Sequence, residues 1–171
     1  MTVLTRQNNH LSRITALKIY TPDECKSIIK FALNNWTEEK GTISVDSIQP
    51  AMEDLELRNT TLFIPPETER KSSWCEKINN TIINLNNEKE SYGFDISGMM
   101  EPPIMMRYMA PDINPNKKAG KYDWHIDIGP ESLSTIRKLS YSILLNVGEY
   151  EGGELEFQIG KNAEVCPNPR S

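Results

Sequence analysis

The sequence predicts an α+β fold, because two helical patterns lie in its first half and strand patterns dominate its second half. We expect the first helix over residues 22–35 and the second over residues 73–86. After about residue 100 the apolar side chains alternate with a period of two, which is typical of strands. This order of elements favours helices that pack against an antiparallel sheet, or a β-barrel with helical support.

The first helix has a complete start signal. Thr21 can cap it, Pro22 suits its first position, and Glu24 completes a capping box. Apolar residues then recur at helical spacing, namely Cys25, Ile28, Ile29, Ala32, Leu33 and Trp36. The second helix is expected to be capped by Ser72 or Ser73, and its apolar stripe comprises Trp74, Ile78, Ile82 and Leu85.

Five segments have the composition or the alternation of strands: residues 60–64, 104–109, 122–127, 139–147 and 154–158. Gly152-Gly153 precedes the last of these segments and predicts a tight turn with positive φ.

Composition and charge exclude several classes of protein. With 171 residues, 37% of them hydrophobic and 25% charged, the chain is long enough for one globular domain with its own core. A net charge of −5 gives no basic face for nucleic acid. No apolar run approaches the roughly 20 residues of a membrane span, and the N-terminus lacks the apolar segment of a secretory signal.

The three cysteines, Cys25, Cys75 and Cys166, are odd in number and far apart, which fits neither a disulfide framework nor a zinc ribbon. Free thiols and a cytoplasmic location are therefore expected. We expect residues 1–13, with a solvated His10, to form a polar arm, and residues 14–171 to form a single domain.

The candidate site contains one of only two histidines. In an extended strand, side chains two residues apart point to the same side, so His125 and Asp127 would converge on one point. Such a pair plus one further His makes the facial triad that binds Fe(II) and leaves positions open for oxygen and a cosubstrate. The spacing alone is weak evidence, because a His two residues from an Asp is also common in surface pairs.

The motifs around this pair make the pattern more specific. They are Arg107-Tyr108, Trp124-His125-Ile126-Asp127, Arg137-Lys138-Leu139-Ser140, and Tyr150-Glu151-Gly152-Gly153-Glu154-Leu155. Together they resemble the catalytic region of the Fe(II)/2-oxoglutarate-dependent dioxygenases, in particular the prolyl 4-hydroxylase-like and PKHD-type hydroxylase branch. The helix start at Thr21, the segment Arg58-Asn59-Thr60 and residues 92–98 fit as well, so the resemblance covers nearly all of the chain after about residue 14.

The resemblance implies a double-stranded β-helix, or jelly roll, supported by N-terminal helices. It implies that 2-oxoglutarate is converted to succinate and CO2 while a C–H bond of a peptidyl residue, such as proline, or of a small molecule is hydroxylated. His125 and Asp127 would be the iron ligands and catalytic residues, and Tyr108 would bind the cosubstrate. Fe(II) and 2-oxoglutarate are the implied cofactors, and ascorbate is a further candidate. For Tyr108, core packing of a strand aromatic stays an open alternative.

The chain departs from this pattern towards its C-terminal end. The family has a second iron-binding His and then a cation for the distal carboxylate of 2-oxoglutarate, but no His follows His125 here. Leu144 stands where related hydroxylases often have a Tyr. We therefore expect a jelly roll without its last strands, and an incompetent site in these 171 residues alone.

Three explanations stay open: an incomplete sequence, a shortened inactive relative, or a ligand from another chain. We favour the first, because a jelly roll without its final strands exposes unpaired edges. The leading function is the hydroxylase, and the alternative is an inactive jelly-roll module for binding or assembly. A metal-dependent hydrolase fits less well, because no nucleophile or zinc-type ligand set accompanies the pair. Arg137 and Lys138 are interpreted as a solvated entry to a strand.

Overall fold

The computed structural model describes residues 2–6, 14–43, 51–88, 92–99, 101–111, 118–127, 136–159 and 162–165. His10 and Cys166 lie outside these residues. The chain divides into two compact units that are each discontinuous in sequence. The first unit comprises Met1–Ile29, Lys77–Gly98 and Lys138–Ser171, and the second comprises Lys30–Glu76 and Met99–Arg137.

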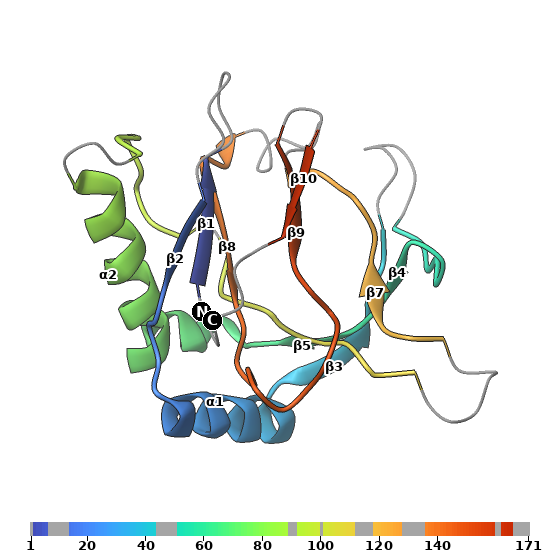
Figure 1. Ribbon diagram of the computed structural model, residues 1–171. Coiled ribbons are helices and arrows are strands. Elements are labelled where there is room, and N and C mark those ends of the chain that lie inside the picture. The colour runs from blue at the N-terminus through green and yellow to red at the C-terminus, as the bar shows by residue number, and fades with distance from the viewer. Residues whose placement is uncertain are drawn as a thin grey trace. The chain divides into compact units, whose positions relative to one another are not determined.

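Helix α1 spans Pro22–Asn35, as predicted (Figure 1). Its capping box is formed: the N–H of Glu24 donates to the Thr21 hydroxyl at 3.2 Å, and the N–H of Thr21 donates to the Glu24 carboxylate at 2.7 Å. Cys25, Ala32 and Trp36 are buried, but Leu33 is exposed, so the buried stripe is narrower than predicted.

Helix α2 spans Ser73–Asn87, also as predicted, and follows the short 3-10 helix η1, Glu67–Lys71. The Ser72 hydroxyl donates to the main-chain carbonyl of Glu69. The main-chain carbonyl of Ser72 accepts the N–H of Glu76. Buried residues recur along one face of α2: Cys75, Ile78, Ile82 and Asn86.

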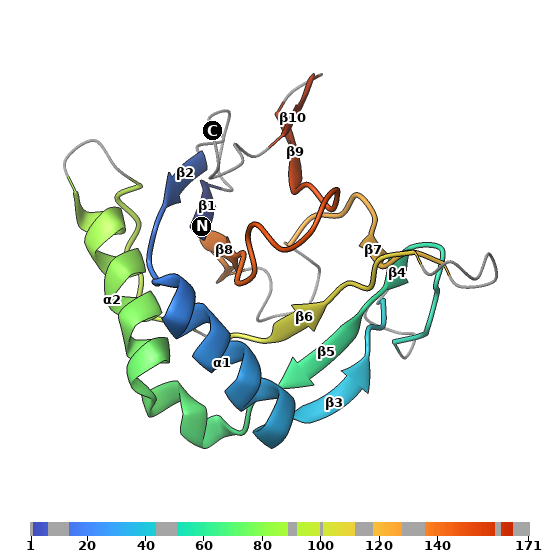
Figure 2. The ribbon, with the colours of Figure 1, turned by 60° about the horizontal axis from the view of Figure 1, so that its bottom comes forward.

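The second unit contains an antiparallel sheet of strands β3 (Thr37–Lys40), β5 (Thr61–Ile64) and β6 (Met105–Arg107), in the order β3-β5-β6 (Figure 2). Its core is formed by Ala32, Trp36 and Phe63, with Trp74 and Met105 partly buried against them. The helices therefore pack on a sheet as predicted, but two of its three strands precede residue 100. The sheet is therefore not built only from segments after about residue 100: β5 lies in the predicted segment 60–64, and β3 was not predicted, because its charged residues show no alternation.

A second, smaller sheet in this unit pairs β4 (Arg58–Asn59) with β7 (Lys121–Tyr122). Gly120 brings the segment before β7 against the residues after β6. Its N–H donates to the carbonyl of Met109 at 2.7 Å, and a Cβ at Gly120 would lie 2.7 Å from Cα of Tyr108. Only glycine permits this approach, which places β7 beside the end of β6.

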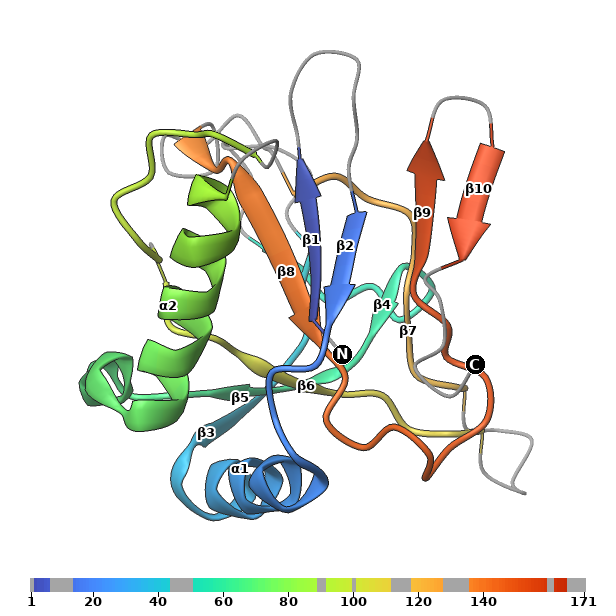
Figure 3. The ribbon, with the colours of Figure 1, turned by 60° about the vertical axis from the view of Figure 1, so that its left-hand side comes forward.

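The first unit contains the antiparallel sheet β2-β1-β8, formed by Ile14–Leu17, Thr2–Arg6 and Leu139–Ile143 (Figure 3). No strand is predicted in the polar arm over residues 1–13, so the central strand β1 is a correction. Its five residues carry too little apolar pattern to be distinguished from an arm, and pairing on both sides forms the strand. Strand β8 is confirmed but ends at Ile143, not at residue 147.

Strands β9 (Glu156–Ile159) and β10 (Asn162–Val165) form an antiparallel pair in the same unit. Gly152 and Gly153 precede β9 with φ of 73° and 69°, so the predicted positive φ is confirmed at both glycines, whereas the turn that the structure assigns in this region lies at residues 147–148. In the described residues, the strands form four antiparallel sheets of two or three strands each. The α+β class is therefore confirmed. Among the described residues, neither helix is both long and apolar enough to cross a membrane.

Candidate metal centre

His125 and Asp127 lie directly after β7, not on a strand. The strand ends at Tyr122, and the chain bends at Trp124 and again at Asp127. The predicted extended segment 122–127 is therefore wrong after its first residue. The side chains nevertheless converge, because Nε2 of His125 lies 3.5 Å from Oδ1 of Asp127. Both are partly exposed, at 40% and 39% of the side-chain surface.

A main-chain contact fixes the tautomer of His125. Nδ1 lies 2.7 Å from the carbonyl oxygen of Asp123, and a carbonyl can only accept, so Nδ1 carries the proton and donates. In the neutral imidazole, Nε2 then presents its lone pair to the Asp127 carboxylate. Two acceptor atoms facing each other favour a cation or a proton between them. The interaction with Asp127 accordingly raises the pKa of His125, and the Asp123 carbonyl acts in the same direction.

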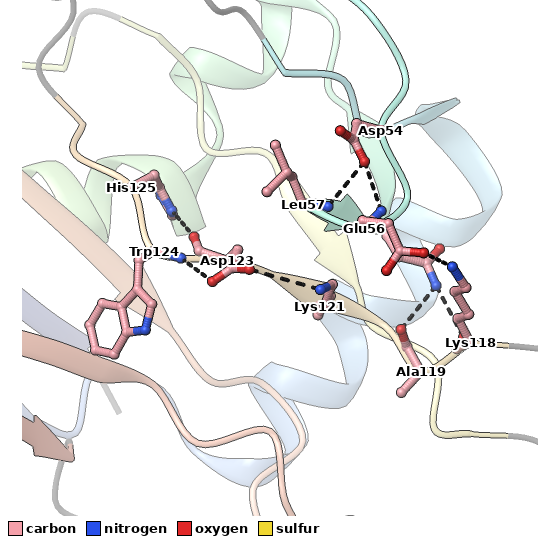
Figure 4. A network of polar contacts seen from close by, with 10 residues as sticks. Asp54, Glu56, Leu57, Lys118, Ala119, Lys121, Asp123, Trp124 and His125 are labelled. Atoms are coloured by element: carbon pink, nitrogen blue, oxygen red, sulfur yellow. Dashed lines mark hydrogen bonds and ion pairs between the residues drawn. The ribbon is translucent and has the colours of Figure 1, made fainter.

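The imidazole is held in a stack of three planar groups. The rings of His125 and Tyr122 are nearly parallel, with centroids 3.7 Å apart and an interplanar angle of 15°. The guanidinium carbon of Arg58 lies 4.3 Å from the centroid of Tyr122. One face of the Tyr122 ring is covered by the imidazole, so the cation must lie over the other face. Trp124 is not part of this stack; its ring is exposed and points away from His125 (Figure 4).

Arg58 is fixed by contacts along its whole side chain. Nη1 donates to the carbonyl of Thr42 at 2.8 Å, and Nε donates to the hydroxyl of Thr60 at 3.3 Å. A Cβ at Gly41 would lie 2.9 Å from Nε of Arg58, so the backbone of Gly41 closes this side. Nη2 has a weaker contact, 3.9 Å from Sδ of Met106.

Tyr108 directly follows β6, which ends at Arg107. The predicted strand, residues 104–109, included Tyr108, but the observed strand does not. It is 46% exposed, so it is not the core residue of the alternative interpretation. Its hydroxyl lies 3.5 Å from Sδ of Met106, the same sulfur that Arg58 contacts. Partial loss of hydration raises the pKa of Tyr108, and the nearby charge of Arg58 opposes this effect.

A polar network holds the segment that carries the site (Figure 4). The N–H of Asp123 donates to the carbonyl of Leu57 at 2.8 Å, and the Asp123 carboxylate accepts the N–H of Trp124 at 2.8 Å. The Asn59 amide donates to the carbonyls of Lys118 and Ala119, while Lys118 pairs with Glu56. The turn at residues 54–57 thus anchors the start of the segment that leads to His125.

Arg137 anchors the other end of the site. Nη1 donates to the main-chain carbonyl of Asp127 at 3.2 Å, and Nη2 pairs with the Glu101 carboxylate at 3.0 Å. Its interpretation as a solvated strand entry is therefore wrong, since it fixes the backbone of a candidate ligand. Sequence reasoning missed this role and that of Arg58, because neither contact follows any local spacing. The only local signal was that Arg58 begins a strand and that Arg137 lies two residues before one.

The donors present fit two of the three protein ligands of a facial Fe(II) site. An imidazole nitrogen and a carboxylate oxygen are the required donor types, and protein ligation bonds of about 2.1 Å allow neighbouring donors roughly 3 Å apart. The 3.5 Å separation is close to this value. Among the described residues, no third His, Cys, Asp or Glu completes a metal-binding group.

Comparison with family models found no match, and neither the curated proteins nor the solved structures contain a match to this chain.

Proposed function

We propose that the protein is an Fe(II)- and 2-oxoglutarate-dependent hydroxylase with a jelly-roll core. The observation that carries the proposal is the pair of facing acceptors, His125 Nε2 and Asp127 Oδ1, with the His125 tautomer set by Asp123. The overall reaction converts a C–H bond, O2 and 2-oxoglutarate into a C–OH bond, succinate and CO2. The substrate would be a peptidyl residue, such as proline, or a small molecule. Iron would supply the activation of oxygen.

The residues of the chain have distinct parts in this proposal. His125 and Asp127 would hold the iron, and Tyr108 would donate its hydroxyl to the cosubstrate. Tyr122 keeps the imidazole plane in place through its stacking contact. In the neutral imidazole, the Asp123 carbonyl holds the proton on Nδ1 and so leaves the lone pair of Nε2 for a metal, because a His ligand must be unprotonated at the coordinating nitrogen.

The first prediction is that Asp127→Ala in the full-length protein abolishes iron-dependent turnover. A methyl group can neither ligate the metal nor balance its charge, and loss of a ligand is expected to reduce the rate at least about a hundredfold. The measurement is succinate release from 2-oxoglutarate with Fe(II) and O2, together with the metal content of the protein. Asp95→Ala is the matched control, because Asp95 is an exposed carboxylate of the other compact unit.

Two outcomes would contradict the proposal. Turnover in Asp127→Ala equal to the unsubstituted protein would remove its role as a ligand. A full-length protein that binds no divalent metal and releases no succinate would instead favour the alternative of a binding module.

A further inference from the structure

The contacts of Arg58 leave one edge of its guanidinium group without a strong acceptor. Nη1 and Nε are bound to Thr42 and Thr60, both neutral partners. In the part of the chain that the structure describes, Arg58 forms no ion pair, and Nη2 contacts only the thioether of Met106, at 3.9 Å. A thioether is a weak acceptor, so this edge of the cation keeps most of its capacity to bind an anion.

The Tyr108 hydroxyl is in the same situation. Its contact among the described residues is also Sδ of Met106, at 3.5 Å. Two donors, one of them charged, are thus directed at one weakly accepting atom. Met106 is itself 42% exposed, and its unbranched side chain can change rotamer, so a ligand oxygen can replace the sulfur.

The position of this pair relates it to the candidate ligands. Arg58 lies over one face of Tyr122 and His125 lies over the other, so the guanidinium is no farther from the imidazole than the two stacking distances together. The Tyr122 ring lies between the two groups, so a ligand that reaches both has to pass around the edge of this ring.

We propose that Arg58 Nη2 and the Tyr108 hydroxyl form a carboxylate-binding subsite, with Met106 occupying it in the absence of ligand. The carboxylate belongs either to the 2-oxo acid cosubstrate or to an acidic substrate. The subsite deepens the proposed function, but its carboxylate binding does not need the metal. Arg58 is suited to this role because its other contacts and its stacking on Tyr122 fix its orientation in advance.

The test is a titration of the metal-free chain with succinate, in which binding is measured by NMR of labelled Tyr and Arg side chains. We expect saturable shifts at Tyr108 and Arg58. Tyr108→Phe and Arg58→Gln should each weaken succinate binding about tenfold or more, because each removes a hydrogen bond in a charged pair. Arg58→Gln also loses the contacts to Thr42 and Thr60, whereas Tyr108→Phe loses only the hydroxyl group. If Arg58→Gln does not fold, the result with Tyr108→Phe therefore decides the test.

Lys40→Gln is the matched control for charge. Lys40 pairs with Glu53 in the same unit, and this substitution should leave succinate binding unchanged. Equal affinity in the unsubstituted chain and Tyr108→Phe would overturn the inference, as would equal weakening by Lys40→Gln and Arg58→Gln.

A competition experiment assigns the source of the carboxylate. If 2-oxoglutarate with Mn(II) displaces succinate, the subsite holds the cosubstrate; if both bind together, it holds the carboxylate of a substrate. Because the succinate measurement uses no metal, the two proposals can fail separately. Carboxylate binding without turnover would leave the subsite and remove the hydroxylase, and turnover without an effect of Tyr108→Phe on succinate binding would do the reverse.

Discussion

At the scale of single residues, the site depends on groups that bind His125 and Asp127 at atoms other than their candidate donor atoms. Nδ1 of His125 is bound by a main-chain carbonyl, and the carbonyl of Asp127 is bound by Arg137. Both contacts act on the backbone or on the atom that faces away from the candidate metal. They therefore restrict the orientation of the donors without consuming them, which is the usual function of groups that support metal ligands.

The role of Arg137 in holding the Asp127 backbone can be tested by metal binding, without a turnover assay. We predict that Arg137→Met weakens binding of Mn(II) about tenfold, because the Asp127 backbone loses its anchor while both ligands remain. The measurement is the dissociation constant for Mn(II), from the broadening of His125 ring signals. Stability should change little, since the ion pair with the half-exposed Glu101 contributes at most about 1 kcal/mol.

Arg107→Met is the matched control for this experiment. Arg107 forms a similar exposed ion pair, with Glu38 at 3.1 Å, in the same unit. Equal weakening in both variants would mean that lost positive charge, and not the anchor on Asp127, determines metal affinity.

At the scale of elements, the helices depend on local chemistry that can be read from the sequence. Thr21, Pro22 and Glu24 start α1 where the capping box predicts, and the apolar spacing gives the extent of both helices. Glu24 has a second partner that no local rule predicts, because its carboxylate also binds Lys77 of α2 at 2.7 Å. One carboxylate thus caps α1 and contacts α2 within the first unit.

The pH dependence of stability should reveal this double role. The hydrogen bond to Lys77, followed by that to the N–H of Thr21, lowers the pKa of Glu24 below its ordinary 4.5. A lowered folded-state pKa stabilises the protein above the unfolded pKa, and this stabilisation is lost as pH falls through the folded-state value. We predict that Glu24→Gln destabilises the protein at neutral pH, and that the difference shrinks as pH falls below about 4.5.

The measurement is the free energy of unfolding by urea at several pH values. Glu76→Gln is the control, because Glu76 lies in the first turn of α2 and has no ion pair among the described residues. A difference between Glu24→Gln and the unsubstituted chain that does not depend on pH would contradict the prediction.

Some strands can be predicted from the sequence, and others form only through their pairing with neighbouring strands. Strands β5, β6, β8 and β9 were predicted because their apolar residues alternate or are β-branched. Strand β3 reads Thr-Glu-Glu-Lys, and only its pairing with β5 makes it a strand. The candidate site behaves in the same way: His125 and Asp127 were proposed from their spacing and the surrounding motifs, although they do not lie on the expected strand, whereas the contacts of Arg58 and Arg137 arise from tertiary structure.

At the scale of the whole molecule, both compact units are assembled from segments far apart in the chain. Strand β1 pairs with β8, whose residues lie more than 130 positions later in the sequence. Strand β5 pairs with β6, and α2 lies between these two strands in the sequence. The boundary between the units also falls within each helix, between Ile29 and Lys30 in α1 and between Glu76 and Lys77 in α2. Each helix therefore contributes residues to both units.

This arrangement predicts that no N-terminal fragment folds by itself. A chain that ends at Gly98 lacks β8, so β1 loses one of its two partners, and it lacks β6, so β5 loses one as well. It also lacks Met105, which packs against the core of Ala32, Trp36 and Phe63. A domain is stable by only about 5–15 kcal/mol, so the fragment has little margin for the loss of a strand from each unit. We expect the fragment 1–98 to show no cooperative thermal transition by near-ultraviolet circular dichroism, whereas the 171-residue chain shows one. Helix α1 should persist only partly, because a single helix of 14 residues is marginal in water. A cooperative transition in the fragment would mean that one unit forms its core without the segments after residue 98, contrary to the observed strand pairing.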